Sequence, residues 1–241
     1  MKYHECKMYP DERMKETIYD AIEQGKQPPW TAMKLHLEAQ DTSLPGWDAL
    51  LQLVETAAID RREIFAPKKD LGSELWSQCI TLPSSISKLK NIKKLDLYGS
   101  SLLRIPPEIG AMDNLEEFDP YTSYGLHWYP YEITRCPRLS RSRVSTRALY
   151  GNYKYRPPFP SLHPPVHELV PARCSVCDGA IDQSRAEQLW ISIRVATDVL
   201  PLLVNSCSRS CVEMLPQPPD HYVQVPHKGG PSVEQPAAES W

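Results

Sequence analysis

The feature that most constrains the fold of this chain is an apolar pattern that recurs after 23 residues. The first unit carries Leu82, Pro83, Ile86, Leu89, Ile92, Leu95 and Leu97, and the second carries Ile105, Pro106, Ile109, Met112, Leu115 and Phe118. Units of this length typically form one short strand and return through a helical turn, so that neighbouring units stack on one another. The pattern therefore predicts a stacked structure whose usual role is to bind a partner.

Size and composition favour several modules around a packed core. The chain has 241 residues, of which 41% are hydrophobic, and two or three modules are expected for this length. No apolar stretch near either end approaches the roughly 18 residues of a membrane span, and Met1–Glu5 does not lead into a signal segment. We therefore expect a cytoplasmic protein without a membrane partner. The formal charge of −3 gives no overall attraction to nucleic acid.

The residues before the repeats predict helices. Apolar spacing favours helices over residues 11–25, over Thr31–Gln40 and over Trp47–Phe65, the last being the longest. An open stack of repeats exposes its core unless another unit covers the end. Residues 1–70 are therefore expected to form a helical cap on the first repeat.

The pattern weakens on both sides of the two good units. Leu75–Leu82 is a partial unit, and Tyr129–Val144 continues the spacing with one inserted residue, which gives a repeat region of residues 71–155. Aromatic residues are dense from Tyr121 to Tyr131, where they form either an interface or a roof over the open end. Residues 156–171 resemble a Pro-rich linker, and the composition of residues 217–241 predicts a disordered tail.

The two units resemble the bacterial and plant-like class of leucine-rich repeats, whose unit runs L-x-x-L-x-L-x-x-N-x-L-x-x-I-P-x-x-I. The resemblance covers about residues 75–145 and implies an α+β protein with a short solenoid. Where that class has a loop-bonding Asn, this chain has Ser100 and Ser123. A hydroxyl bonds the loop backbone less completely than an amide, so a short, distorted solenoid is favoured over a long regular one.

The resemblance also implies which side chains leave the exposed face of the sheet, because successive residues of a strand alternate sides. One alternative is a binding face and the other is an ordinary solvated sheet surface. The candidate partner-binding residues are Lys94, Asp96, Tyr98, Glu117, Asp119, Tyr121, Arg141 and Arg143, with Ser145 beside them.

Four cysteines form two close pairs, Cys174 with Cys177 and Cys207 with Cys211. In a chain without a signal segment such pairs indicate a metal site before they indicate disulfides. Four thiolates suit a closed, structural Zn²⁺ site. A metal-free thiol cluster and an iron–sulfur site are the alternatives, and His163 or His167 could replace one ligand.

The sequence around these cysteines predicts two strands, Leu189–Ala196 and Val199–Val204, followed by a short helix that contains Cys211. A knuckle, a hairpin and such a helix resemble the treble-clef zinc fold. The resemblance covers residues 172–216 and implies a module that needs its metal to fold.

Three function classes remain. The first is a non-catalytic protein–protein interaction module that binds through the repeat surface, as an adaptor or a toxin-neutralising (immunity) protein. The alternative is a nucleic-acid-binding protein that uses the zinc module and the basic, aromatic segment 138–156. An enzyme is not expected, since the chain has no Gly-rich phosphate loop, H-E-x-x-H or G-x-S-x-G motif, and no small-molecule substrate is implied.

Overall fold

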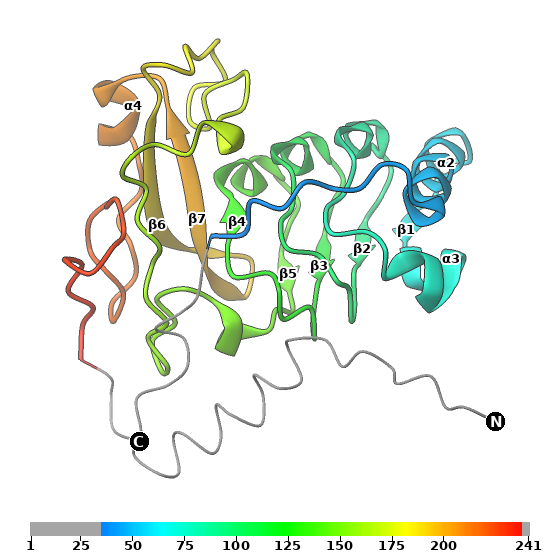
Figure 1. The fold of residues 1–241 in the computed structure, drawn as a ribbon, viewed down its shortest axis with the longest axis horizontal. Coiled ribbons are helices and arrows are strands. Elements are labelled where there is room, and N and C mark those ends of the chain that lie inside the picture. The colour runs from blue at the N-terminus through cyan, green and yellow to red at the C-terminus, as the bar shows by residue number, and fades with distance from the viewer. Residues whose placement is uncertain (1–34, 238–241) are drawn as a thin grey trace.

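The computed structural model describes residues 35–237, which form a mixed α/β structure (Figure 1). Short parallel strands form a sheet along one side of the stack of repeats, and helical turns lie along the other side. A second, three-stranded sheet closes one end of this assembly, and two helices lie at the other end. The predicted helix over residues 11–25 lies outside the described residues.

The parallel sheet has the order β1-β2-β3-β5. Its strands are β1 (Ile64–Phe65), β2 (Lys94–Asp96), β3 (Glu117–Asp119) and β5 (Arg141–Ser142). Lys94 pairs with Glu117, and Glu117 pairs with Arg141. The paired positions therefore follow the repeat seen in the sequence, with the one inserted residue in the third unit.

Each unit enters its helical turn through a proline. The 3₁₀ helices Ser84–Lys88, Pro107–Ala111 and Tyr131–Arg135 follow the extended residues Pro83, Pro106 and Pro130. Proline favours this position because its φ is fixed and it has no N–H to leave unpaired. The third residue after each of these prolines, namely Ile86, Ile109 and Ile133, is completely buried.

Serine side chains connect the loops that follow the strands. The Ser100 hydroxyl donates to the Ser123 hydroxyl at 2.7 Å, and the Ser123 hydroxyl donates to the Leu97 carbonyl at 2.9 Å. The Ser145 hydroxyl accepts from the Thr122 amide one unit later. Both Ser100 and Ser123 are buried. Serines one repeat apart therefore supply loop hydrogen bonds at positions where the resemblance implies asparagine.

Two helices cover the first unit. Helix α2 (Pro45–Ile59) buries Leu50, Leu53 and Val54, and α3 (Pro67–Trp76) follows β1. The predicted helix Trp47–Phe65 is therefore too long, because Arg61 has φ of 52° and the chain leaves the helix before Phe65 enters the sheet. The helix expected over Thr31–Gln40 is wrong for residues 35–40, which have no regular structure, while 31–34 lie outside the described residues.

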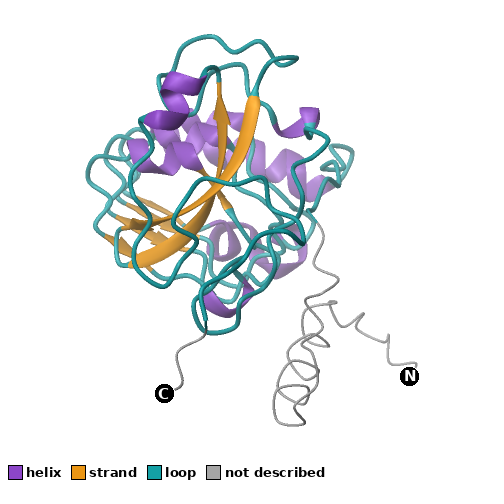
Figure 2. Ribbon diagram, turned by 90° about the vertical axis from the view of Figure 1, so that its left-hand side faces the viewer, coloured by secondary structure: helices purple, strands orange, loops and turns teal. Residues whose placement is uncertain are grey.

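The second sheet has the order β4-β7-β6. Strands β6 (Glu187–Val195) and β7 (Asp198–Ser206) form the antiparallel hairpin that the sequence predicted, and β4 (Tyr129–Pro130) pairs with β7 in parallel. Figure 2 shows the long strands in orange with loops outside them. One hairpin face joins the core of the repeat region, while Trp190 and Leu203 on the other face pack with Trp128, Tyr150, Phe159 and Leu162.

Two segments expected to be extended or disordered are packed against this outer face. In the predicted linker 156–171, Phe159 and Leu162 are buried. In the predicted disordered tail 217–241, His227 forms a β-bridge with Trp190 and the Lys228 carbonyl accepts from the Leu162 amide. Residues 217–237 are therefore not a free tail, because the outer hairpin face is apolar and these two segments cover it.

Candidate metal centre and binding face

The four predicted ligand cysteines converge at one end of the hairpin. Their sulfur atoms all lie within 4.8 Å of one another, and no other such group of His, Cys, Asp or Glu occurs between residues 35 and 237. The sulfur of Cys207 is 3.6 Å from that of Cys177 and 3.7 Å from that of Cys211. Sulfurs bound to one tetrahedral Zn²⁺ at about 2.3 Å are separated by about 3.8 Å. The cluster is thus compatible with a metal site.

The first pair lies on a tight turn. The Cys174 amide donates to the Gly179 carbonyl at 2.8 Å, the Asp178 amide donates to the Cys174 carbonyl, and Arg173 forms a β-bridge with Ala180. Asp178 adopts φ of 59°, which turns the chain back after Cys177. This knuckle, residues 173–180, holds both sulfurs on one side of the turn.

The second pair is positioned by a strand end and a helix start. Cys207 directly follows β7, and Cys211 lies in α4 (Arg209–Glu213). The Ser208 side chain caps α4 by accepting from the Cys211 amide. The spacing C-x₃-C therefore brings the two sulfurs together across the first helical turn.

The four thiols change one another's tendency to ionise. Burial raises the pKa of the Cys174 thiol, but the amides of Cys177, Val176 and Cys207 donate to its sulfur and lower the pKa to about 7. Hydrogen bonds with the other cysteines raise the pKa of Cys207 to about 12. Four adjacent thiols therefore resist full ionisation together, and a metal ion bound among them would supply the compensating positive charge.

The knuckle is bonded to the third repeat unit. The Arg135 guanidinium donates to the carbonyls of Cys174 and Ser175 at 2.7 and 2.9 Å, and it pairs with Asp178 at 2.8 Å. The buried Glu132 carboxylate accepts from the Ser175 hydroxyl at 2.8 Å, and burial raises the pKa of this carboxyl. These contacts attach the cysteine cluster to the repeat region.

Sequence reasoning missed Arg135, Glu132 and Ser175. Their only local signal is that Glu132 and Arg135 lie in one helical turn of the third unit, and nothing in the spacing names the knuckle as their partner. His163 and His167, the alternative ligands, are exposed and do not belong to the cysteine cluster.

The structure brings the predicted partner-binding residues together on the parallel sheet, where most of their charges are paired. Glu117 bonds Lys94 at 2.7 Å and Arg141 at 3.3 Å across three strands. Arg143 bonds both oxygens of Asp119, at 3.0 and 2.6 Å, which explains why Asp119 is buried instead of exposed. Asp96 accepts from the Tyr98 amide.

Two tyrosines stand out from this face. Tyr98 and Tyr121 are 43% and 42% exposed, and their ring centroids lie 6.2 Å apart. The Arg143 guanidinium lies 5.8 Å from the Tyr98 centroid and 5.2 Å from that of Tyr121, and the Lys68 ammonium lies 5.5 Å from Tyr98. Lys68 was not predicted from the sequence, because α3 brings it to this face from outside the repeats.

The basic, aromatic segment 138–156 is less available than its composition implies. Arg141 and Arg143 form the ion pairs given above. The Arg156 guanidinium donates to the carbonyls of His221 and Ala237, so the C-terminal segment holds it. Tyr150 is fully buried.

The dense aromatics that follow Tyr121 divide between the two roles considered for them. Tyr129 lies in β4 and is buried in the repeat core, and Trp128 is buried on the outer face of the second sheet, so both belong to the closed end, whereas Tyr121 is exposed beside the parallel sheet.

No helix between residues 35 and 237 has the length and apolar character to cross a membrane. Neither the comparison with protein-family models nor the search of curated proteins matches this chain, so the reading of its function depends on the geometry above.

Proposed function

We propose that this protein is a non-catalytic interaction module that binds a protein partner through the exposed face of its parallel sheet. The observation that carries the proposal is the pair Tyr98 and Tyr121, each more than two-fifths exposed and bridged by Arg143. Tyrosine and arginine are the residue types most enriched at interface hot spots. Because Asp119 already fixes the Arg143 side chain, little side-chain entropy is lost when a partner packs on this unit.

In the same proposal, residues 71–155 form a short leucine-rich repeat solenoid. Strand pairs that follow the sequence repeat, buried apolar positions after each proline and serine-bonded loops all support it. The two helices at one end and the β6–β7 hairpin at the other would then be caps that prevent exposure of the core.

We further propose that the metal is a structural Zn²⁺ held by Cys174, Cys177, Cys207 and Cys211. Zinc would supply a tetrahedral centre with no open position for water. The four cysteines would join the knuckle to the end of β7 and to α4, while Arg135 joins the knuckle to the third unit. The site would therefore fix the hairpin against the repeats.

The charge distribution favours a protein over a nucleic acid as the partner. Binding to nucleic acid depends on cations that neutralise phosphates. On this face Lys94, Arg141 and Arg143 already pair with carboxylates of the same sheet. A phosphate backbone would have to compete with these carboxylates, whereas a protein surface can pack on the tyrosines without breaking the pairs.

The test is recovery of the tagged protein from its source cells, with and without nuclease. A Tyr98→Ala, Tyr121→Ala double variant is compared with Tyr153→Ala, which removes another exposed tyrosine outside the sheet. We expect a stoichiometric protein partner that resists nuclease and salt, is lost with the double variant and is retained with the control. Retention by both variants, or recovery of nucleic acid that nuclease and salt remove, would reject the proposal.

A further inference from the structure

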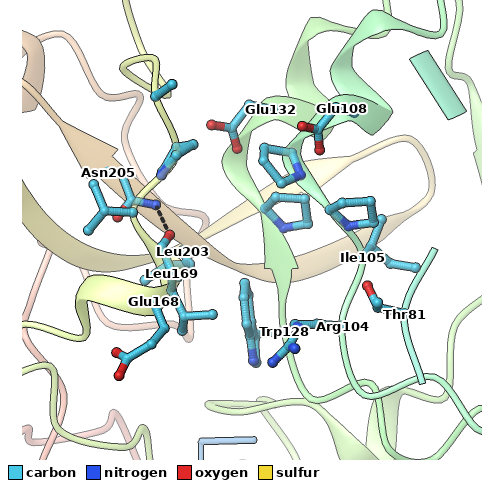
Figure 3. A pocket seen from close by; sticks show the side chains of 16 residues that line it. Thr81, Arg104, Ile105, Glu108, Trp128, Glu132, Glu168, Leu169, Leu203 and Asn205 are labelled. Atoms are coloured by element: carbon cyan, nitrogen blue, oxygen red, sulfur yellow. Dashed lines mark hydrogen bonds between the residues drawn. The ribbon is translucent and has the colours of Figure 1, made fainter. Parts of the chain in front are cut away.

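A cavity of about 250 Å³ lies between the proline-containing edge of the repeats and segment 168–172 (Figure 3). Its walls are mainly apolar and include Ile105, Pro106, Pro130 and Leu203. Side chains of the hairpin hold the outer wall in place, since the Asn205 amide donates to the Leu169 carbonyl at 3.1 Å. The cavity is a preformed pocket of the size of one large side chain.

One end of the pocket presents hydrogen-bond donors. Trp128 is 4% exposed, and its indole N–H has no hydrogen-bond partner among the described residues. In Figure 3 this nitrogen stands at the same end of the pocket as the Arg104 guanidinium. Arg104 donates to the carbonyls of His36 and Glu38, which leaves further N–H groups of its five available. A buried donor without an acceptor is costly, so this end is suited to an oxygen acceptor.

The opposite end presents carboxylates. Glu108 and Glu132 lie there (Figure 3), and burial, with a smaller contribution from the charge of Glu108, raises the pKa of Glu132. Glu132 accepts from the neutral Ser175 hydroxyl. Glu108 takes part in none of the ion pairs found among residues 35–237. Glu168 adds a third carboxylate beside Leu169, away from the end that holds Glu108 and Glu132 (Figure 3). The end with Glu108 and Glu132 is suited to a cation.

We propose that the pocket receives a basic side chain, Arg or Lys, from an extended segment of a protein partner. The backbone carbonyl of that residue would accept from Trp128 and Arg104, and its cationic head would bond Glu108 and Glu132. Its aliphatic stem would pack on the prolines between the two ends. Basic side chains bury their stems on apolar surface in this way while the head keeps polar partners.

The charges of the pocket exclude the opposite ligand class. A phosphate or an acidic side chain would meet Arg104 at one end but Glu108, Glu132 and Glu168 elsewhere, so the net charge of the lining repels it. The inference rests on the proposed function only in that the occupant belongs to a protein. The pocket residues differ from those of the sheet face, so the tests of the two binding sites can give opposite results.

The probe is the blocked peptide acetyl-Gly-Arg-Gly-amide, compared with acetyl-Gly-citrulline-Gly-amide, which has nearly the same shape without the charge. Binding to the full chain is followed by NMR through the indole N–H signal of Trp128. The chain has six tryptophans, so Trp128→Phe identifies this signal by its loss.

We expect the arginine peptide to shift the Trp128 signal saturably and to bind more tightly than the citrulline peptide. Loss of one charge-assisted bond in Glu108→Gln should weaken binding about tenfold. Glu74→Gln, which changes an exposed carboxylate in α3, should leave it unchanged. A Trp128 signal whose chemical shift does not change on addition of peptide, equal binding of the two peptides, or equal effects of the two glutamate variants would overturn the proposal.

Discussion

Replacement of Arg135 by methionine tests whether the repeat region controls the metal site. The substitution keeps most of the aliphatic stem and removes a guanidinium that contacts the knuckle at three points, namely the carbonyls of Cys174 and Ser175 and the Asp178 carboxylate. No cysteine is changed. Any loss of metal affinity must therefore come from the orientation of the knuckle.

The magnitude follows from these contacts. A hydrogen bond from a charged donor is worth roughly 1.5 to 3 kcal/mol when well buried, and an exposed ion pair about 0.2 to 1 kcal/mol. The Arg135 side chain is 30% exposed and Asp178 is 49% exposed, so the lower end of both ranges applies. Two carbonyl bonds and one ion pair then amount to about 3 kcal/mol, shared between folding and metal binding. Outer contacts of metal ligands typically change affinity by about 10- to 100-fold.

The assay is titration of the reduced, metal-free protein with Co²⁺ in the presence of a competing chelator, because tetrahedral thiolate coordination gives Co²⁺ a strong visible spectrum. We expect Arg135→Met to keep the spectrum of the wild type while its affinity falls at least about tenfold. Arg209→Met is the matched control, since its ion pair with Glu213 is exposed and spans one turn of α4. An affinity within about twofold of the wild type in Arg135→Met would refute the reasoning, since the contacts would then be worth under about 0.5 kcal/mol.

Two further predictions concern stability. Cys174→Ser should abolish tight metal binding and unfold residues 172–216. A lower melting temperature that no longer responds to chelator, together with loss of bound zinc in elemental analysis, would show this. An unchanged melting temperature and zinc content would contradict the proposed metal site. Burial lowers the pKa of His127 to about 4 from 6.5, so the unfolded chain binds more protons, and the stability present above pH 6.5 should be lost as the pH falls toward 4. The loss from this group is about 3 kcal/mol, and in denaturant titrations His127→Phe should flatten the pH dependence; an unaltered slope would contradict the burial argument.

The sequence alone determined what recurs or is local. The repeat spacing correctly marked positions such as Leu95 and Phe118 as buried, because equivalent positions of successive units meet the same surroundings. The cysteine spacing marked a cluster whose sulfurs the structure brings within 4.8 Å of one another, because a tight turn and one helical turn each hold a close pair. The hairpin was also predictable from its two apolar runs.

Only the tertiary structure decided which side chains become partners. Asp119 is buried because Arg143 covers it from the next strand, and Arg135 reaches the knuckle across 39 positions of the chain. The same cause explains why the predicted disordered tail is wrong for residues 217–237. Their proline-rich composition gives no sign of the apolar hairpin face around Trp190 on which they pack. A single sequence encodes local spacing directly, whereas contacts between distant segments depend on how the units and caps pack.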